Sequence, residues 1–441
     1  MRAFSGKRIG DSHLSAALVS SAASLATKIA AAGAGVLLTY LIAHRFGAAG
    51  SGTWVLATTI LQIAGYVGLC GLDYGTTRAI AVFASQERWS AARAWIRSGV
   101  LLVAVAGGLT SLLLLLARGP LSTLLSEPPT FADMLLPVSL AVIPYGLMRL
   151  AAGSLRGLRR FVASDALENG VMPAALSLIM LIVGIQRLTD LAYGYLAVSI
   201  AAAAAGLGAW RRTVRGKPTG VAPLMLQEAL TRSLPLAGTV LATLASPWIV
   251  TLSLGGAATT AEVGVYRVAL QFALLLGFLL NAVETGLSPQ IAALHSHHKL
   301  ADLAHTAKRL TLLLIVLGGI PSLILFTFAE TFLSIFGPEF PQGATALRVL
   351  IAAQMVNLAT GPVGSFMVMT GLERISFRNA VMGTILVLIL SALLIPVLGT
   401  VGAAIASASA TVFRNLIATY YVWNRHGLLL PVGLVRDRGS A

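Results

Sequence analysis

The sequence contains one cysteine, Cys70, and this residue lies inside an apolar run. A single thiol excludes an internal disulfide framework and a cysteine-based zinc site. Charge is also scarce, because only 11% of the 441 residues are Asp, Glu, Lys or Arg, whereas 57% are hydrophobic. In soluble domains about a quarter of all residues are charged, so this composition predicts a polytopic membrane protein.

Carboxylates are scarcer than cations. The sequence has 16 Asp and Glu but 31 Lys and Arg, which gives a formal net charge of +15. The cations are spread between apolar segments and do not gather on a polar domain, so we expect no nucleic-acid partner. The sequence also lacks a Walker A, an HExxH and a CxxC motif, and its connections are short. We therefore expect no enzyme activity, no cofactor and no metal site.

Hydropathy predicts twelve membrane-spanning helices in an all-α fold, because each apolar stretch has about the 20 residues that cross a bilayer. The expected spans are 14–46, 52–72, 98–117, 135–152, 171–188, 193–210, 234–254, 263–287, 310–336, 344–370, 380–398 and 401–423. They form two six-helix lobes, residues 1–215 and 216–441.

The two lobes resemble each other at an offset of about 211 residues, which places Gly52-Thr53-Trp54 on Gly264-Val265-Tyr266. This offset covers an even number of spans, so the repeats have parallel topology. Carriers with such repeats rock two lobes about a central site. The pattern therefore predicts a V-shaped transporter that works by alternating access.

The basic residues also predict the orientation of the chain in the membrane. The N-terminus, the even-to-odd connections and the segment after the last span hold 24 of the 31 Lys and Arg, whereas the opposite connections hold 3. By the positive-inside rule both termini are cytoplasmic. The first apolar stretch is too long for a signal peptide, so we expect it to be retained in a multi-pass protein of the cell inner membrane. Residues 86–97 are expected to form a helix that lies on the inner leaflet.

Lys28 is the most informative polar residue, because it lies near the middle of the first span. A charge at the bilayer centre costs roughly 2.5–3.5 kcal/mol on insertion scales, so it normally faces a watery cavity or a partner group. Small and polar residues share its helix face, namely Ser21, Ser24, Ala32, Gly35 and Thr39. A lysine that lines a cavity and a structural lysine paired between helices both fit this pattern.

Further polar residues lie inside later spans. Arg267, Gln271, Asn281 and Thr285 share one face of the eighth span, and Ser407, Thr411 and Arg414 share one face of the twelfth. For Gln62, Asn357 and the hydroxyls we expect hydrogen bonds between helices. Glu284 and Glu330 are expected to be the main carboxylates among the spans. A cavity with more cations than carboxylates would attract an anion that has an extended apolar part.

Several motifs resemble those of a known family. FGAAGSGTW at 46–54 and GLDYGTTR at 71–78 are similar to the opening signatures of the polysaccharide-transporter flippases (Wzx-like), within the multidrug/oligosaccharidyl-lipid/polysaccharide exporter superfamily. VGVYRVA at 263–269 and FGPEF at 336–340, followed by Gly343 and Leu350, resemble its second-half signatures.

This resemblance implies a flippase that moves polyprenyl-diphosphate-linked oligosaccharide from the cytoplasmic to the outer leaflet, driven by a proton or sodium gradient. It implies a cationic lumen that maps onto Lys28, Arg78, Arg267 and Arg414. The expected partners are the lipid-linked glycan, membrane lipid and the polysaccharide polymerase machinery.

Two alternatives remain open at the level of the sequence. A multidrug exporter of the same superfamily would be expected to place carboxylates where this chain has Lys28. A membrane polysaccharide polymerase or ligase would be expected to have a long outer loop with paired basic residues, whereas the outer connections predicted here are short.

Overall fold

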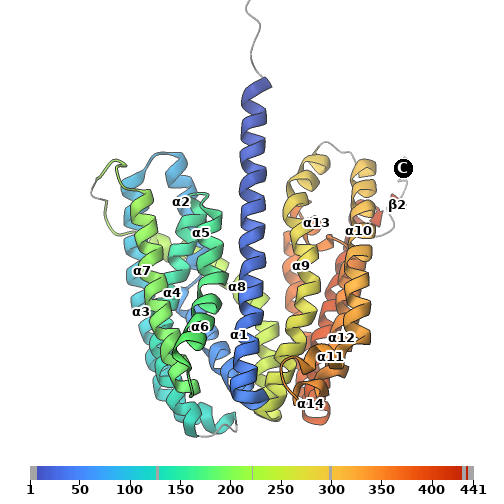
Figure 1. Ribbon diagram of the computed structural model, residues 1–441. Helices are drawn as coiled ribbons and strands as arrows, with labels where there is room; N and C mark the ends of the chain where they lie inside the picture. The colour runs from blue at the N-terminus through green and yellow to red at the C-terminus, as the bar shows by residue number, and fades with distance from the viewer. Residues whose placement is uncertain (1–6, 126–128, 221, 297–299, 430–433, 436–441) are drawn as a thin grey trace, which may run out of the picture. The chain divides into compact units, whose positions relative to one another are not determined.

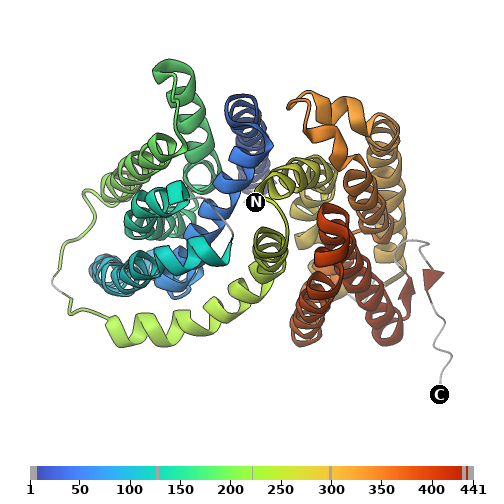
Figure 2. The same cartoon turned by 90° about the horizontal axis from the view of Figure 1, so that it is seen from below.

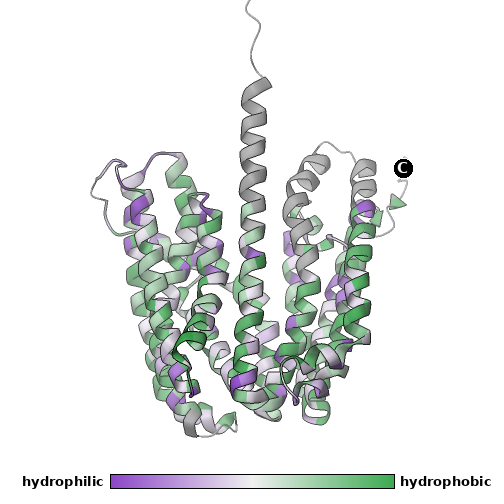
Figure 3. Cartoon of the chain, viewed as in Figure 1, coloured by the Kyte–Doolittle hydropathy of each residue, from purple (hydrophilic) through white to green (hydrophobic). Residues whose placement is uncertain are grey.

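The computed structural model describes residues 7–125, 129–220, 222–296, 300–429 and 434–435 (Figure 1). Within these ranges the chain is helical apart from its connections and an antiparallel pair of short strands, β1 (Leu428–Leu429) and β2 (Leu434–Val435). Ten helical segments of the described chain are long and apolar enough to cross a membrane. Hydrophobic residues accordingly recur along the coloured helices in Figure 3. The predicted all-α polytopic fold is confirmed.

The helices follow one another with few residues between them. The first part of the chain forms α1 (Lys7–Leu69), α2 (Leu72–Ser85), α3 (Trp89–Leu124), α4 (Pro129–Gly157), α5 (Phe161–Asp165), the π-helix η1 (Ala166–Gly170), α6 (Val171–Val183) and α7 (Leu188–Thr213). The second part forms α8 (Leu226–Ala257), α9 (Thr260–Ser296), α10 (Leu300–Thr327), α11 (Ala329–Ser334), the 3-10 helix η2 (Phe340–Gly343), α12 (Ala344–Thr360), α13 (Val363–Met369) and α14 (Glu373–His426).

Two of the ten segments are each long enough for two spans, and each is interrupted at one glycine. In α1 the backbone of Gly47 has φ 69°, and in α14 the backbone of Gly399 has φ 51°. These left-handed values are ones that glycine adopts without a steric penalty. Counted as two spans each, α1 and α14 raise the ten candidates of the described residues to the twelve predicted spans.

Contacts divide the chain into two compact units, which are described separately below. Unit 1 comprises Met1–Leu41, Ile60–Arg118 and Ala132–Gly238, and unit 2 comprises Ile42–Thr59, Gly119–Phe131 and Thr239–Ala441. Each unit thus contains a segment from the other half of the sequence. The division into lobes 1–215 and 216–441 stays a prediction.

In unit 1 the start of α3 is buried against α2. The Trp95 side chain is fully buried, and its indole N–H donates a hydrogen bond of 3.1 Å to the Thr76 hydroxyl. About one full turn of the helix is therefore packed against protein, because Ala92 and Ile96 are buried as well. The prediction that residues 86–97 lie on the inner leaflet is wrong, because the apolar face that suggested a lipid contact packs inside unit 1.

In unit 2 α12 lies in the interior, where it packs against α9, α10 and α14. Leu347, Ile351 and Leu358 are buried on this helix. The orange and red helices of this unit are seen end-on in Figure 2, and they form a bundle. Polar groups that are buried on α12 need hydrogen-bond partners, and neighbouring helices can supply them.

Candidate functional site

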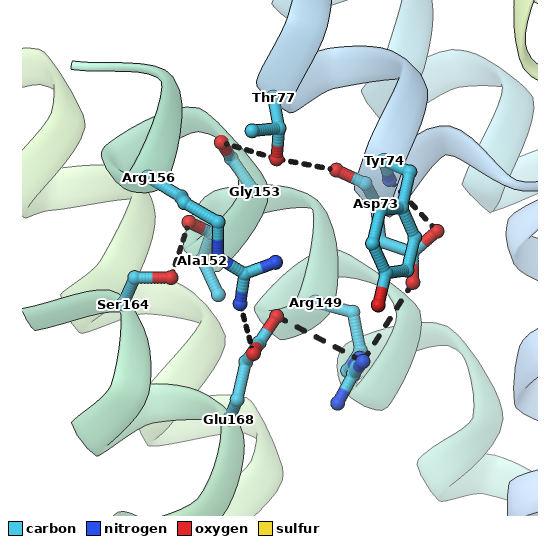
Figure 4. A network of polar contacts seen from close by, with 9 residues as sticks. All are labelled: Asp73, Tyr74, Thr77, Arg149, Ala152, Gly153, Arg156, Ser164 and Glu168. Carbon is cyan, nitrogen blue, oxygen red and sulfur yellow. Dashed lines mark hydrogen bonds and ion pairs between the residues drawn. The ribbon is translucent and has the colours of Figure 1, made fainter. Parts of the chain in front are cut away.

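A cluster of four charged side chains is buried in unit 1 (Figure 4). The Arg149 guanidinium lies with its Nη2 atom 3.6 Å from Asp73 Oδ2 and 3.8 Å from Glu168 Oε1. Arg156 forms a second ion pair with Glu168. The side chains of Asp73 and Arg149 are only 1% and 12% exposed. Two carboxylates and two guanidinium groups balance, so the cluster carries no net charge.

Local structure explains how α2 and α4 bring Asp73 and Arg149 together. Asp73 lies in the first turn of α2, where the Tyr74 N–H donates a 2.9 Å hydrogen bond to its Oδ1 atom. The Thr77 hydroxyl lies 3.1 Å from the carbonyl oxygen of Gly153 on α4. A Cβ atom at position 153 would lie 2.4 Å from the Asp73 carbonyl oxygen, so this close helix approach requires glycine.

Glu168 reaches the cluster from the π-helix η1. A π-turn is wider than an α-turn and changes the direction of the side chains that follow it, which is why such turns are frequent at functional sites. The preceding helix is attached to α4 by a hydrogen bond of 2.9 Å from the Ser164 hydroxyl to the Ala152 carbonyl oxygen. The cluster therefore joins α2, α4 and η1.

Aromatic rings complete the surroundings of Arg149. Its guanidinium carbon lies 4.9 Å from the centre of the Tyr66 ring, and this ring meets that of Tyr145 edge to face at 6.4 Å. Within the described residues Asp73 Oδ2, Glu168 Oε1 and Arg149 Nε have no hydrogen-bond partner. Because its charges cancel, the cluster is better suited to hold helices together than to bind a charged solute.

The expectation that Glu284 and Glu330 are the main carboxylates among the spans is corrected by this cluster. The Glu330 side chain is 66% exposed and pairs with Arg348 at 3.3 Å. Glu284 lies outside the residues whose side chains are described. Asp73 and Glu168 are the carboxylates of buried ion pairs in the described chain.

The two predicted cations of unit 1 lie outside this cluster. Lys28 is partly exposed on α1, and the described residues include no hydrogen bond or ion pair to its ammonium group. One turn further along, Ala31 approaches Gly170 of η1, where a Cβ atom would lie 3.7 Å from the Ala31 Cβ. Arg78 is exposed on α2 and likewise has no ion pair within the described chain.

The other predicted site residues belong to unit 2. Arg267 is exposed on α9, next to Tyr266, which is buried and shares a 2.7 Å hydrogen bond with the Ser407 hydroxyl. Gln271 is partly buried one turn further along the helix. Asn281 lies outside the residues whose side chains are described.

Arg414 of α14 is partly buried. Its aliphatic stem packs on Gly383, where a Cβ atom would lie 2.7 Å from the Arg414 Cγ and Cδ atoms. The Arg414 carbonyl oxygen accepts a 2.8 Å hydrogen bond from Asn379. No ion pair of the described residues includes Arg267 or Arg414. A single site that combines these residues with Lys28 and Arg78 stays a prediction.

Neutral polar groups form a continuous chain between α12 and α14 in unit 2. The Asn357 amide donates to Gln354 Oε1 at 3.1 Å, and the Asn415 amide donates to Asn357 Oδ1 at 3.0 Å. The Thr360 hydroxyl lies 3.1 Å from Asn415 Oδ1. The expected interhelical hydrogen bond of Asn357 is thereby confirmed.

Comparisons with known proteins agree with this architecture. Residues 235–394 match the MatE family. A stretch of 194 residues is 27% identical to the "Probable flippase AglR" of Haloferax volcanii, and it covers 43% of this chain. The match spans 40% of the length of that curated relative.

Solved structures share the fold over nearly the whole chain. An inward-facing "multidrug resistance MATE family transporter of the MOP superfamily" gives a TM-score of 0.72 at 15% identity, over 89% of this chain and 94% of the other. "Lipid II flippase MurJ" in its inward closed conformation also gives 0.72, at 14% identity, over 92% and 87%. The fold is thus that of multi-pass membrane transporters and flippases.

Proposed function

We propose that this chain is a flippase that moves a polyprenyl-diphosphate-linked oligosaccharide from the cytoplasmic to the outer leaflet by alternating access. The observation that carries the proposal is the positive charge without a counter-ion on apolar helices. Within the described residues, Lys28, Arg267 and Arg414 form no ion pair with a carboxylate. Such charges are costly in a membrane, so they normally serve a solute pathway.

A lipid-linked diphosphate would supply negative charge to pair with these cations. Its phosphate oxygens form charge-assisted hydrogen bonds with ammonium and guanidinium groups, and these bonds are stronger where water is scarce. Its polyprenyl tail can remain in the bilayer while the headgroup crosses. The proposed binding residues are Lys28, Arg78, Arg267, Gln271, Asn281 and Arg414. They bind the headgroup and perform no covalent chemistry.

The remaining parts of the proposal concern the cell. The protein is placed in the inner membrane with both termini cytoplasmic, and a proton or sodium gradient drives transport. It delivers its substrate to polysaccharide polymerase machinery on the outer side. The likeness to a "Probable flippase" and to a "Lipid II flippase" supports a lipid-linked substrate.

A second candidate function is export of organic cations. The MatE match at 235–394 and the likeness to a multidrug transporter favour it. A cation pathway needs carboxylates that are not already neutralised, however, and in the described chain Asp73 and Glu168 are both paired with arginine. The charge balance therefore favours an anionic substrate.

Deletion of the gene in its host tests the proposal. The lipid-linked oligosaccharide should be assembled at a normal level but should remain on the cytoplasmic leaflet, out of reach of an impermeant glycosidase added to spheroplasts. Restoring the wild-type chain should restore cleavage. Unpolymerised glycan that is already exposed on the outer leaflet of the deletion strain would contradict the proposal and favour a polymerase.

A further inference from the structure

Two glycines of unit 2 meet in a reciprocal way that no side chain could reproduce. A Cβ atom on Gly52 of α1 would lie 1.7 Å from the carbonyl oxygen of Thr260, and one on Gly264 of α9 would lie 2.1 Å from that of Ala48. Each glycine thus contacts the carbonyl group four residues before the other. Each added Cβ would also lie 3.0 Å from the backbone nitrogen of the opposite glycine.

This reciprocity is the mark of a local twofold axis, because in a self-complementary contact residue i meets residue j and j meets i. Gly52 and Gly264 are also the residues that the internal repeat of the sequence places on each other. Two independent observations therefore agree that the twofold axis of the repeat passes between these two glycines. The backbones of α1 and α9 can approach so closely because both positions lack a Cβ atom.

A second contact lies beside this crossing. Gly47 interrupts α1, so the helix restarts at Ala48 with backbone N–H groups that have no partner within the helix. The Glu339 carboxylate accepts a 2.7 Å hydrogen bond from the Ala48 N–H. A Cβ atom on Gly47 would lie 3.2 Å from the same carboxylate oxygen. Glu339 thus caps a helix that lies 291 residues away in sequence.

The position of Glu339 is fixed by packing around η2. The next residue, Phe340, is 1% exposed and its ring centre lies 6.2 Å from that of Phe336. At the other end of η2, a Cβ atom on Gly343 would lie 2.5 Å from Val265 Cγ1 on α9. The segment that carries Glu339 therefore packs on α9, the helix that carries Gly264. The cap and the glycine crossing are thus parts of one packed region.

We propose that the Gly52–Gly264 crossing and the Glu339–Ala48 cap form a clasp that closes the outer side of the protein and opens during each transport cycle. The proposal rests on the proposed transport function and on the predicted orientation, in which residues 47–51 and 337–343 are outer connections. At the crossing point itself the contact is backbone to backbone, because neither glycine carries a side chain. The hydrogen bond from the Ala48 N–H to the Glu339 carboxylate stabilises the closed state and can break and re-form.

Thiol labelling of intact spheroplasts tests the clasp. The full chain carries Cys70→Ser and one reporter, Val263→Cys, whose native side chain is fully buried next to the crossing. The measured quantity is the rate of reaction with an impermeant maleimide. Removing a helix cap shifts an opening equilibrium by about fivefold, so Glu339→Ala should raise the rate about fivefold. Glu339→Gln should raise it less, because the amide oxygen can still accept the hydrogen bond.

Gly52→Ala should raise the labelling rate at least as much as Glu339→Ala, because its Cβ would collide with the Thr260 carbonyl oxygen. Gly33→Ala is the matched control on the same helix, because its Cβ would meet nothing within 4 Å, and its rate should equal that of the parent. If Gly52→Ala does not reach the membrane, the pair of Glu339 variants decides the question.

An unchanged labelling rate in Glu339→Ala, at normal abundance, would overturn the proposal. The assay measures exposure of a thiol and not the distribution of a glycan, so it separates the two proposals. Faster labelling of the clasp variants together with a normal distribution of glycan in the deletion strain would support the clasp and refute the proposed substrate.

Discussion

The two units differ in their most connected interior polar network. Unit 1 has an ionic cluster, in which Arg149 pairs with both Asp73 and Glu168 and Arg156 pairs with Glu168. Unit 2 has a neutral chain of amides and a hydroxyl that joins α12 to α14. In neither arrangement is a carboxylate left over for another cation. Lys28, Arg267 and Arg414 belong to neither network and have no ion-pair partner among the described residues.

The comparison also indicates how much stability each unit would lose if one buried polar interaction were removed. Breaking a buried ion pair leaves an isolated charge in an apolar environment, which costs about 3–5 kcal/mol. Breaking one neutral hydrogen bond between membrane helices costs about 0.6 kcal/mol on average. The ionic interior of unit 1 is thus sensitive to single substitutions, whereas the amide chain of unit 2 tolerates them.

The largest expected effect follows from removing Arg149. Arg149→Ala leaves Asp73 buried without a cation, so the purified protein should lose about 3–5 kcal/mol of stability. Thermal unfolding in detergent measures this loss. The matched control is Arg232→Ala, because Arg232 pairs with Glu228 at an exposed surface, where such pairs contribute about 0–1 kcal/mol. Equal unfolding temperatures for the two variants would refute the structural role of the cluster.

Substitution of Lys28 should affect transport and leave stability unchanged. Loss of one charge-assisted hydrogen bond, worth about 1.5–3 kcal/mol, predicts a reduction of about tenfold or more in the transport rate of Lys28→Ala. Lys28→Arg should keep more activity than Lys28→Ala. In a Cys70→Ser background, Lys28→Cys should react with a small polar thiol reagent. An inert thiol at position 28 in every transport state would favour a structural lysine.

The smallest effect is expected in the amide chain. Asn415→Ala removes the donor to Asn357 and the acceptor of Thr360, so it should cost about 1 kcal/mol. The same unfolding measurement would detect a shift of a few degrees. A loss as large as that of Arg149→Ala would mean that the two interiors do not differ in the way described here.

The sequence predicted the spans because length and hydropathy determine them directly. It predicted the positions of Gly47 and Gly399 only as gaps between spans, since the sequence does not show that the helices continue on both sides of each kink. It also predicted the internal repeat through Gly52 and Gly264, which the structure places in mutual contact.

The ionic cluster escaped the sequence analysis for a physical reason. Asp73 and Arg149 lie near the ends of apolar spans, where a charge can reach water and normally needs no partner. Their pairing depends on the close approach of α2 and α4 at Gly153, which is a tertiary feature. One signal was available, because carboxylates are so rare in this chain that each one near a span needs an explanation.

Trp95 is a second case in which tertiary packing could not be predicted from the sequence. Its pattern with Ala92 and Ile96 correctly indicated an apolar helix face, but hydropathy does not distinguish a face that meets lipid from one that meets protein. The hydrogen bond from the Trp95 indole N–H to the Thr76 hydroxyl shows that this face packs against protein. The substrate-binding roles of Lys28 and Arg267 stay predictions, because neither side chain has an ion-pair partner among the described residues.

Reconstitution tests the central claim most directly. Purified protein is inserted into vesicles that contain a polyprenyl-diphosphate-linked disaccharide, and the fraction open to an impermeant glycosidase is followed over time. Wild-type protein should expose the inner-leaflet fraction, and a variant with Lys28→Ala and Arg267→Ala should do so far more slowly. Exposure no faster than in protein-free vesicles, together with efflux of an organic cation by the same preparation, would contradict the account.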